Sequence, residues 1–197
     1  MPSRRIPAAA LSALVAAVIG LAACSVPAGP GVPPSSSAAE ANQGGDIPDN
    51  QAFVSAKGVS GDFEVQIPEG WAETRTGTSK GFTDKLNSVT MVQSPAPVAP
   101  TVQSVTSQDV PDLQKSVPSF VLKDVSVFTR SGGSGVLIRY SGDSAPDPVT
   151  HKSVRQAIER YAFWSNGRMA ALTLASPDGT DNADPWAKIS GSFRWLR

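Results

Sequence analysis

Apolar and polar side chains alternate along several short segments beyond residue 61, and this period of two constrains the fold more than any other feature. Phe63, Val65 and Ile67 are each separated by one polar residue, which is typical of a strand with one buried face. Segments of the same character follow at 88–93, 125–129, 136–140, 153–165 and 168–175. The pattern therefore predicts a sheet in which each strand has one face in a core.

The residues between these segments favour antiparallel pairing. Asn166-Gly167 separates the last two predicted strands, and Asn-Gly is the strongest short-range signal for a hairpin. A Gly-rich stretch at 131–135 separates the strands at 125–129 and 136–140, which predicts another hairpin.

Two helices are predicted beside the strands. Asp109 stands where an N-cap is expected, and the helix that follows ends before Pro118. Asp184-Pro185 places a capping residue and a proline at the start of a short helix that runs to about residue 190. The sequence thus predicts an α+β domain with a mainly antiparallel sheet flanked by helices.

The N-terminus is predicted to be a secretory signal. Arg4 and Arg5 precede an apolar run over residues 8–23, and this order is typical of a signal peptide. The run is shorter than the roughly 20 residues of a membrane-spanning helix. We interpret residues 1–23 as a signal peptide, with an uncleaved membrane helix as the alternative.

The signal ends in Leu21-Ala22-Ala23-Cys24, which resembles the lipobox of bacterial lipoproteins. The resemblance implies recognition of Leu21, Ala22 and Ala23 by a signal peptidase. It also implies that Cys24 carries a diacylglycerol, which places the protein on the extracytoplasmic face of the cell membrane. Cys24 is the sole cysteine, so no intramolecular disulfide can form and the fold must rest on its core. A plain signal peptide with a chance cysteine is the alternative.

Residues 25–50 consist mostly of Pro, Gly, Ser and Ala. Such a segment buries too little apolar surface to offset its ordering entropy, so a disordered linker is predicted. We divide the chain into a signal peptide (1–23), a lipidated cysteine with a flexible linker (24–60) and a folded domain (61–197).

The charge balance argues against nucleic acid as a partner. Lys and Arg together number 17, as do Asp and Glu, and removal of the segment with Arg4 and Arg5 leaves a net charge near −2. Nucleic-acid binding domains usually carry a basic patch or stripe.

The sequence offers no set of residues for catalysis or metal binding. His151 is the sole histidine, and Asp147 and Ser153 lie too close to it in sequence to suggest a catalytic triad. The acidic stretch 178–184 resembles a calcium loop, but Ala183 stands where that loop needs glycine. We therefore predict no catalytic residue, no metal site and no cofactor.

Four tryptophans lie in the predicted domain: Trp71, Trp164, Trp186 and Trp195. Alternation places Trp164 with Ile158 on one strand face, as expected for a core residue. Tryptophan also anchors binding interfaces. Trp71 on its turn and Trp186 near the short helix are the predicted contacts for a partner or an apolar ligand.

Four sets of residues resemble the Mog1/PsbP-like fold and, within it, the actinobacterial lipoproteins of the LpqN/LpqT type. They are the run from Phe63 to Ile67-Pro68-x-Gly70-Trp71, the spacing of Phe82, Asp84 and Val89, the pair of Arg155-Gln156-Ala157 with Asn166-Gly167, and Trp186 followed by Ser192-Phe193. The resemblance implies an α/β/α sandwich and a binding or assembly factor without enzymatic activity.

These observations lead to one expected function and one alternative. The expected function is that of a lipid-anchored envelope lipoprotein that binds a protein partner or assists envelope assembly. The alternative is a carrier for an apolar or lipid-like envelope ligand. A hydrolytic enzyme is the least favoured reading, because the usual pairs of nucleophile and base are missing from the sequence.

Overall fold

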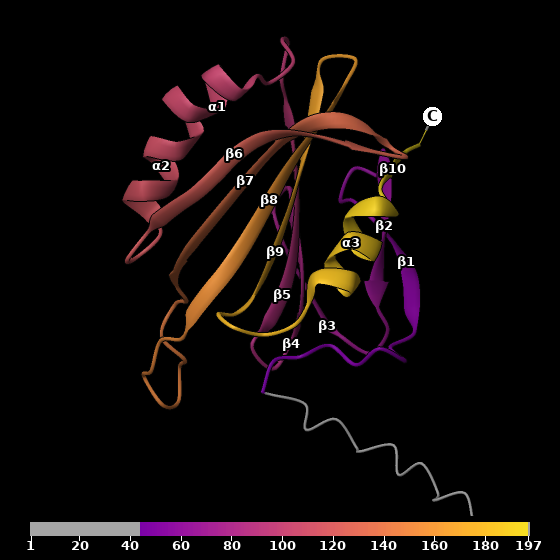
Figure 1. Cartoon of the computed structure of the whole chain (residues 1–197). Helices are drawn as coiled ribbons and strands as arrows, with labels where there is room; N and C mark the ends of the chain where they lie inside the picture. Colours follow the sequence, from indigo (N-terminus) through magenta and orange to yellow (C-terminus); the bar gives the residue numbers. More distant parts are fainter. Residues whose placement is uncertain (1–43, 197) are drawn as a thin grey trace, which may run out of the picture. The chain divides into compact units, whose positions relative to one another are not determined.

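The computed structural model describes residues 44–196 (Figure 1). Seven strands in this part of the chain form one fully antiparallel sheet in the order β3-β4-β5-β9-β8-β7-β6. Their bounds are Ala72–Thr76 (β3), Ser79–Asp84 (β4), Asn87–Pro95 (β5), Val121–Arg130 (β6), Gly133–Asp143 (β7), Arg155–Ser165 (β8) and Arg168–Pro177 (β9).

A second, three-stranded antiparallel sheet has the order β1-β2-β10. Its strands are Phe53–Lys57 (β1), Phe63–Pro68 (β2) and Arg194–Trp195 (β10). The three helices of the described chain are Val102–Ser107 (α1), Asp109–Ser116 (α2) and Ala183–Gly191 (α3).

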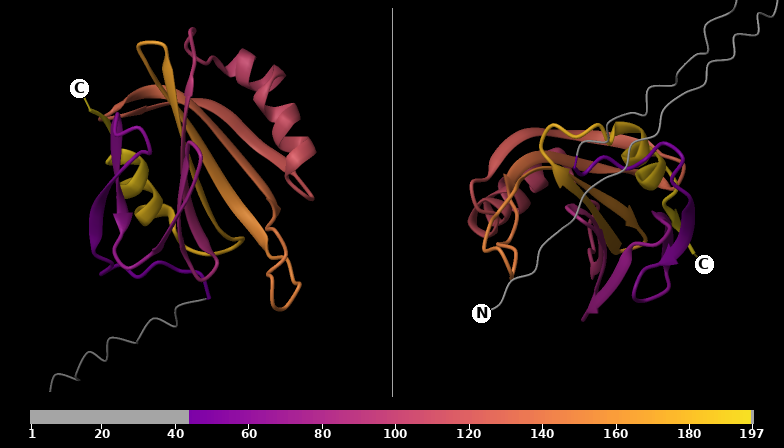
Figure 2. Two further views of the ribbon diagram at one scale, coloured as in Figure 1. Left: turned by 180° about the vertical axis from the view of Figure 1, so that it is seen from behind. Right: turned by 90° about the horizontal axis from the view of Figure 1, so that it is seen from below.

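Helices α1 and α2 cover one face of the seven-stranded sheet, and α3 with the small sheet covers the other. Figure 1 shows α1 and α2 along one face, here called the outer face, with α3 and the small sheet beside the other, the inner face. Figure 2 shows that the large sheet is strongly curved. This arrangement of layers confirms the predicted α+β fold with a mainly antiparallel sheet.

The inner face holds the larger core. Phe63, Val65 and Ile67 of β2 pack against buried side chains of the large sheet, as their alternation predicted. At the centre of this core, the rings of Phe163 and Phe193 stack with centroids 3.8 Å apart. Both rings are fully buried, so this contact joins the chain's C-terminal segment to the large sheet.

The outer face holds a smaller core beneath the helices. Val105 of α1 and Val110 of α2 pack with Val136, Ile138 and other buried residues of the central strands. The large sheet is therefore apolar on both faces at its centre, while each helix presents one apolar side.

The predicted hairpin at Asn166-Gly167 is confirmed. Residues 165 and 168 pair directly, and both turn residues have positive φ values, 48° for Asn166 and 77° for Gly167. Positive φ at both central positions defines a type I′ turn, whose twist matches that of the flanking strands.

The structure corrects the predicted start of the folded domain. Residues 44–60 were assigned to the linker, yet β1 lies within them and pairs with β2. Ile47 is buried, and its backbone N–H donates to Asn182 Oδ1 at 2.8 Å. No apolar alternation marks this segment, because β1 contributes only Phe53 and Ala56 to the inner core and exposes Val54.

The predicted start of the first helical region is also corrected. Helix α1 begins earlier, after Thr101, whose side-chain oxygen accepts from the Ser104 backbone N–H in a capping box. Asp109 is the first residue of α2, not its N-cap. Strands β3 and β4 were missed because every residue of β3 is exposed, so no apolar alternation marks it.

Candidate functional site

The residues predicted to direct lipidation, Leu21, Ala22, Ala23 and Cys24, lie outside the described part of the chain. Between residues 44 and 196, no helix has the length and apolar character needed to cross a bilayer. The same residues contain no group of three or more His, Cys, Asp or Glu side chains arranged to hold a metal ion.

All four tryptophans are half-buried. Trp71, Trp186 and Trp195 pack against the inner core from its margin. Trp164 shares the outer face with Ile158, and its indole Nε1–H donates to the Ala96 carbonyl at 2.8 Å. The sequence predicted a core position for Trp164, and the structure leaves its ring half-buried on the outer face. Of the two predicted contact residues, Trp186 lines a cavity.

Trp186 forms one wall of a trough of about 260 Å³ on the inner face. The trough lies between α3 and strands β6, β7 and β8. These strands line it with Lys123, Arg139 and Glu159, respectively. The N-terminal half of α3 thus brings an aromatic side chain beside charged groups that project from the sheet.

A network of charged groups forms one side of the trough. Arg139 Nε donates to Glu159 Oε1 at 2.7 Å, and its Nη1 lies 3.3 Å from Asp124 Oδ2. The hydroxyl of Tyr161 donates to the other oxygen of Glu159 at 2.5 Å. The hydrogen bond to Glu159 raises the pKa of Arg139, and burial raises the pKa of Tyr161. The network therefore holds the guanidinium in place at the surface.

Strand β6 borders the trough and forms a free edge of the large sheet. Val121 is 45% exposed and pairs with Ser141 on the inner face, whereas Leu122 is 39% exposed and pairs with Tyr140 on the outer face. The pairing of β6 with β7 shifts register between Leu122 and Asp124, which leaves Lys123 as the extra residue of a bulge. Lys123 joins this edge to the trough. We call the trough together with Val121 and the β6 edge the Trp186 surface.

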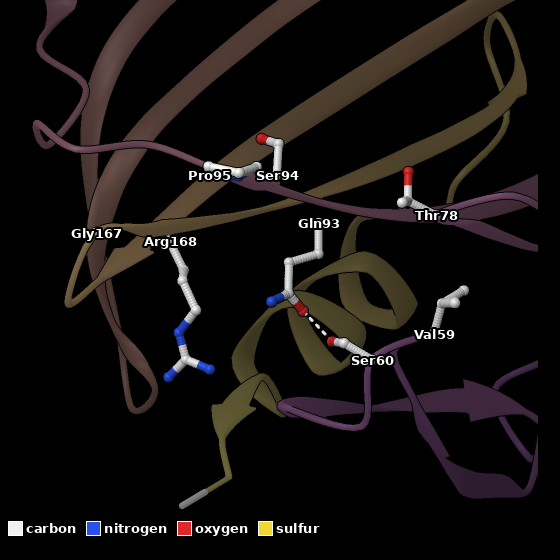
Figure 3. A pocket seen from close by; sticks show the side chains of 8 residues that line it. All are labelled: Val59, Ser60, Thr78, Gln93, Ser94, Pro95, Gly167 and Arg168. Atoms are coloured by element: carbon white, nitrogen blue, oxygen red, sulfur yellow. Dashed lines mark hydrogen bonds between the residues drawn. The ribbon is translucent and has the colours of Figure 1, made fainter.

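A second cavity, of about 310 Å³, lies at the end of the sheets that carries the β1–β2, β3–β4 and β8–β9 turns, opposite the end where the described chain begins (Figure 3). The β1–β2 turn contributes Val59 and Ser60, and the large sheet contributes Gln93, Pro95 and Arg168. We call this cavity the far-end cleft.

A polar network closes the inner side of the far-end cleft. Gln93 Nε2 donates to Asp62 Oδ2 at 2.7 Å, and Arg168 Nη1 lies 3.1 Å from the same oxygen. Hydrogen bonds from Gln93 and Ser60 lower the pKa of Asp62, and the charge of Arg168 adds to this effect. The guanidinium also lies over the Trp195 ring, 5.5 Å from its centroid. These contacts join the β1–β2 turn to the large sheet.

Comparison with solved structures identifies the fold. Cyanobacterial PsbP (CyanoP) from Synechocystis sp. PCC 6803 aligns with a TM-score of 0.53 at 14% identity, over 77% of this chain and 98% of CyanoP. The domain has the Mog1/PsbP-like fold. No family model and no curated protein matches the sequence.

Two further structures align with the Mog1/PsbP-like domain at lower scores. The Ran-binding protein Mog1p of Saccharomyces cerevisiae has a TM-score of 0.47 at 8% identity, over 73% of this chain and 95% of Mog1p. LpqN of Mycobacterium tuberculosis, described as involved in cell envelope biogenesis, has a TM-score of 0.41 at 15% identity, over 76% of this chain and 93% of LpqN.

The sequence did not point to the Arg139 network or to the far-end cleft. Arg139 and Glu159 lie 20 residues apart on neighbouring strands, and only the register of β7 with β8 places them opposite each other. The far-end cleft forms where the β1–β2, β3–β4 and β8–β9 turns meet the C-terminal end of β5. Trp186 was the part of the surface that residue type alone could identify.

Proposed function

We propose that this chain is a lipid-anchored lipoprotein of the cell envelope that acts without catalysis, by binding a protein partner through the Trp186 surface. The observation that carries the proposal is the position of Trp186 beside Arg139 at a free sheet edge. Tryptophan, tyrosine and arginine are enriched among the few residues that carry most of the binding energy at protein interfaces. The lipobox-like residues 21–24 support the anchor.

The Trp186 surface suits a protein partner better than a small molecule. The trough is below the size of most small-molecule sites, and charged side chains form much of its wall. The free edge of β6 presents backbone donors and acceptors to which a partner's extended segment can add. Lys123 in the bulge limits indiscriminate pairing at the same edge.

Site-specific crosslinking in intact cells tests this proposal. A photoreactive residue at Val121 should give a discrete protein adduct, whereas one at Val54, an exposed aliphatic on the small sheet, should not. Arg139→Gln should reduce the Val121 adduct by about thirtyfold, the effect of losing one interface hot spot. An adduct that is equally strong from Val54, or unaffected by Arg139→Gln and Trp186→Ala, would contradict the proposal.

The proposed anchor has a separate test. Cys24→Ala should release the protein into the soluble fraction or leave it unprocessed. Mass spectrometry of the membrane-bound protein should find acyl groups on Cys24. An unmodified Cys24 in processed, membrane-bound protein would contradict the anchor and leave the partner-binding surface unaffected.

The far-end cleft supports a second candidate function, that of a carrier for an apolar ligand. Val59, Pro95 and the aliphatic stem of Arg168 offer carbon surface at the open end of the inner core. If the cleft binds such a ligand, titration with decanoate should give a saturable change in tryptophan fluorescence, because Trp195 lies beside Arg168 of the cleft. If the fluorescence shows no saturable change while the crosslink at Val121 is present, the result would favour partner binding alone.

A further inference from the structure

A third cavity lies at the end of the domain where the described chain begins. Its volume is about 570 Å³, and it lies between the β4–β5 turn and the long loop that joins β7 to β8. Lys85, Leu86 and Asn87 line it from the turn, and Thr150 and Lys152 line it from the loop. We call it the near-end cavity.

The two lysines on its wall have no counter-ion in the described chain. Neither the Lys85 nor the Lys152 ammonium forms an ion pair or a side-chain hydrogen bond among residues 44–196. Asp84 precedes Lys85 but does not line the cavity. Each ammonium therefore keeps three N–H donors for a ligand.

The one carboxylate on the wall is already occupied by its own loop. Asp147 Oδ1 accepts from the backbone N–H of Val149 at 3.0 Å, the backbone N–H of Thr150 at 2.6 Å and the Thr150 hydroxyl at 3.0 Å. These bonds, led by the one from the Thr150 backbone, lower the pKa of Asp147 and keep it ionised. The wall thus carries two positive charges against one negative charge that is turned to its own backbone.

The backbone on both sides of the cavity is strained. Lys85 has a φ of 53° and His151, between Thr150 and Lys152, has a φ of 56°. Residues with a Cβ rarely adopt this left-handed conformation, and such strain gathers at functional sites. Two of the four non-glycine residues with positive φ in the described chain therefore flank one cavity.

The near-end cavity also carries exposed aliphatic side chains at its rim. Leu86 is 43% exposed, and Val149, in the loop beside Thr150, is 83% exposed. Aliphatic side chains next to lysines are the combination found where proteins rest on a bilayer surface, because the apolar groups enter the interface while the cations meet headgroups.

The chain enters the domain beside this cavity. Asn182 Nδ2 donates to the Gly45 carbonyl at 2.9 Å and lies 3.3 Å from Oδ1 of Asn87, a wall residue. Nineteen residues lie between Cys24 and Gly44. Because a flexible peptide of about 20 residues has a root-mean-square length of about 25 Å, a lipid on Cys24 would hold this end of the domain near the bilayer.

We propose that the near-end cavity binds the phosphate-bearing headgroup of an anionic membrane lipid, with Lys85 and Lys152 as its ligands and Leu86 and Val149 in the interface. This proposal rests on the proposed lipid anchor, because the anchor would bring the cavity to the membrane surface where such lipids are present. The anchor would then hold the protein at the membrane, and the cavity, as a second contact, would fix the orientation of the domain on the bilayer surface. The far-end cleft, at the opposite end of the sheets, would remain accessible to other molecules.

Sedimentation with vesicles tests the cavity without the anchor. The chain from residue 24 onward, with Cys24→Ala, contains every described residue of the fold and carries no acyl chain. It should bind vesicles of phosphatidylcholine mixed with phosphatidylglycerol at least about tenfold more tightly than vesicles of phosphatidylcholine alone, since each lysine adds about fivefold to partitioning. Equal binding to both vesicle types would overturn the proposal.

Matched charge variants locate the contact. Lys85→Gln/Lys152→Gln should abolish the preference for anionic vesicles, whereas Lys57→Gln/Arg75→Gln, which removes equal charge near the far-end cleft, should preserve it. Equal loss in both variants would show general charge attraction and overturn the proposal. Lys152→Gln alone should lower the preference about fivefold, and its thermal midpoint should match that of the parent chain.

Two further arms separate the sources of phosphate and the two proposals. Leu86→Ser/Val149→Ser should weaken vesicle binding, and soluble glycerol phosphate should compete poorly. Full competition by glycerol phosphate would assign the cavity to a free phosphate ester and overturn the lipid assignment. Lipidated Cys24 without vesicle preference would overturn only the cavity, and vesicle preference with unmodified Cys24 would overturn only the anchor.

Discussion

Replacement of Phe193 by alanine tests whether the two sheets share one core. Phe193 is fully buried at the junction of α3 and β10. Its ring stacks on Phe163 of β8 with an angle of 8° between the planes, and lies 5.3 Å from the rings of both Phe63 and Trp195. One side chain thus contacts aromatic residues of both sheets.

The expected cost follows from this environment. Truncation of a buried phenylalanine to alanine lowers the free energy of unfolding by about 3–5 kcal/mol. Each favourable aromatic pair adds about 0.5–1.5 kcal/mol, so we expect Phe193→Ala to cost about 5 kcal/mol. In a domain of this size, that loss should lower the melting temperature by about 10–20 °C.

Urea denaturation followed by circular dichroism and by tryptophan fluorescence measures the effect. Both probes should report one transition at a lower midpoint with an unchanged slope. Trp164→Ala is the matched control, because it removes a larger but half-buried ring from the outer face and should cost about 2 kcal/mol. Two separate transitions, or a smaller loss for Phe193→Ala than for Trp164→Ala, would refute a shared core.

Three further changes test other parts of the domain. Gly135→Ala would place a Cβ 2.0 Å from the Ala162 carbonyl oxygen, so it should lower stability by about 3 kcal/mol in a thermal melt; an unchanged midpoint would contradict the tight pairing of β7 and β8. Burial raises the pKa of Asp109 above its ordinary value of 3.8, so ionisation destabilises the fold. Asp109→Asn should therefore stabilise the domain at neutral pH, and in parallel denaturations the gain should fade as the pH drops through the raised pKa and vanish below 3.8. His151→Ala and Asp181→Ala should each change stability by less than about 0.5 kcal/mol, with or without calcium, and a calcium-dependent rise in midpoint that Asp181→Ala abolishes would reveal a metal site.

The fold was predictable where one face of a strand is apolar and where a turn has its own chemistry. The alternation at Phe63, Val65 and Ile67 identified β2, and Asn166-Gly167 identified the hairpin of β8 and β9. Strands β1 and β3 were not predicted, because they lie at sheet edges and contribute few buried side chains. Their pairing depends on neighbours distant in the sequence, which no local pattern records.

The candidate surfaces were less predictable than the fold. Trp186 stood out by residue type, but Arg139 reaches it only through the register of three strands. Lys85 and Lys152 are ordinary surface residues in the sequence, and they share a cavity because the β4–β5 turn and the β7–β8 loop end at the same rim of the sheet. Such sites arise from topology, which composition and spacing do not contain.

The hydrogen bonds of Asn182 give the chain's entry point a mechanical role. A force applied to the residues before Gly44 would act first on two hydrogen bonds of the Asn182 side-chain amide, at the start of α3. The amide accepts one from the Ile47 backbone N–H and donates the other to the Gly45 carbonyl. Strand β1 comes next along the chain, at the edge of the small sheet, where its bonds to β2 would open one after another. The seven-stranded sheet lies outside this path of force. A domain held at this end would therefore yield at its rim under tension and regain its native state without unfolding its larger sheet.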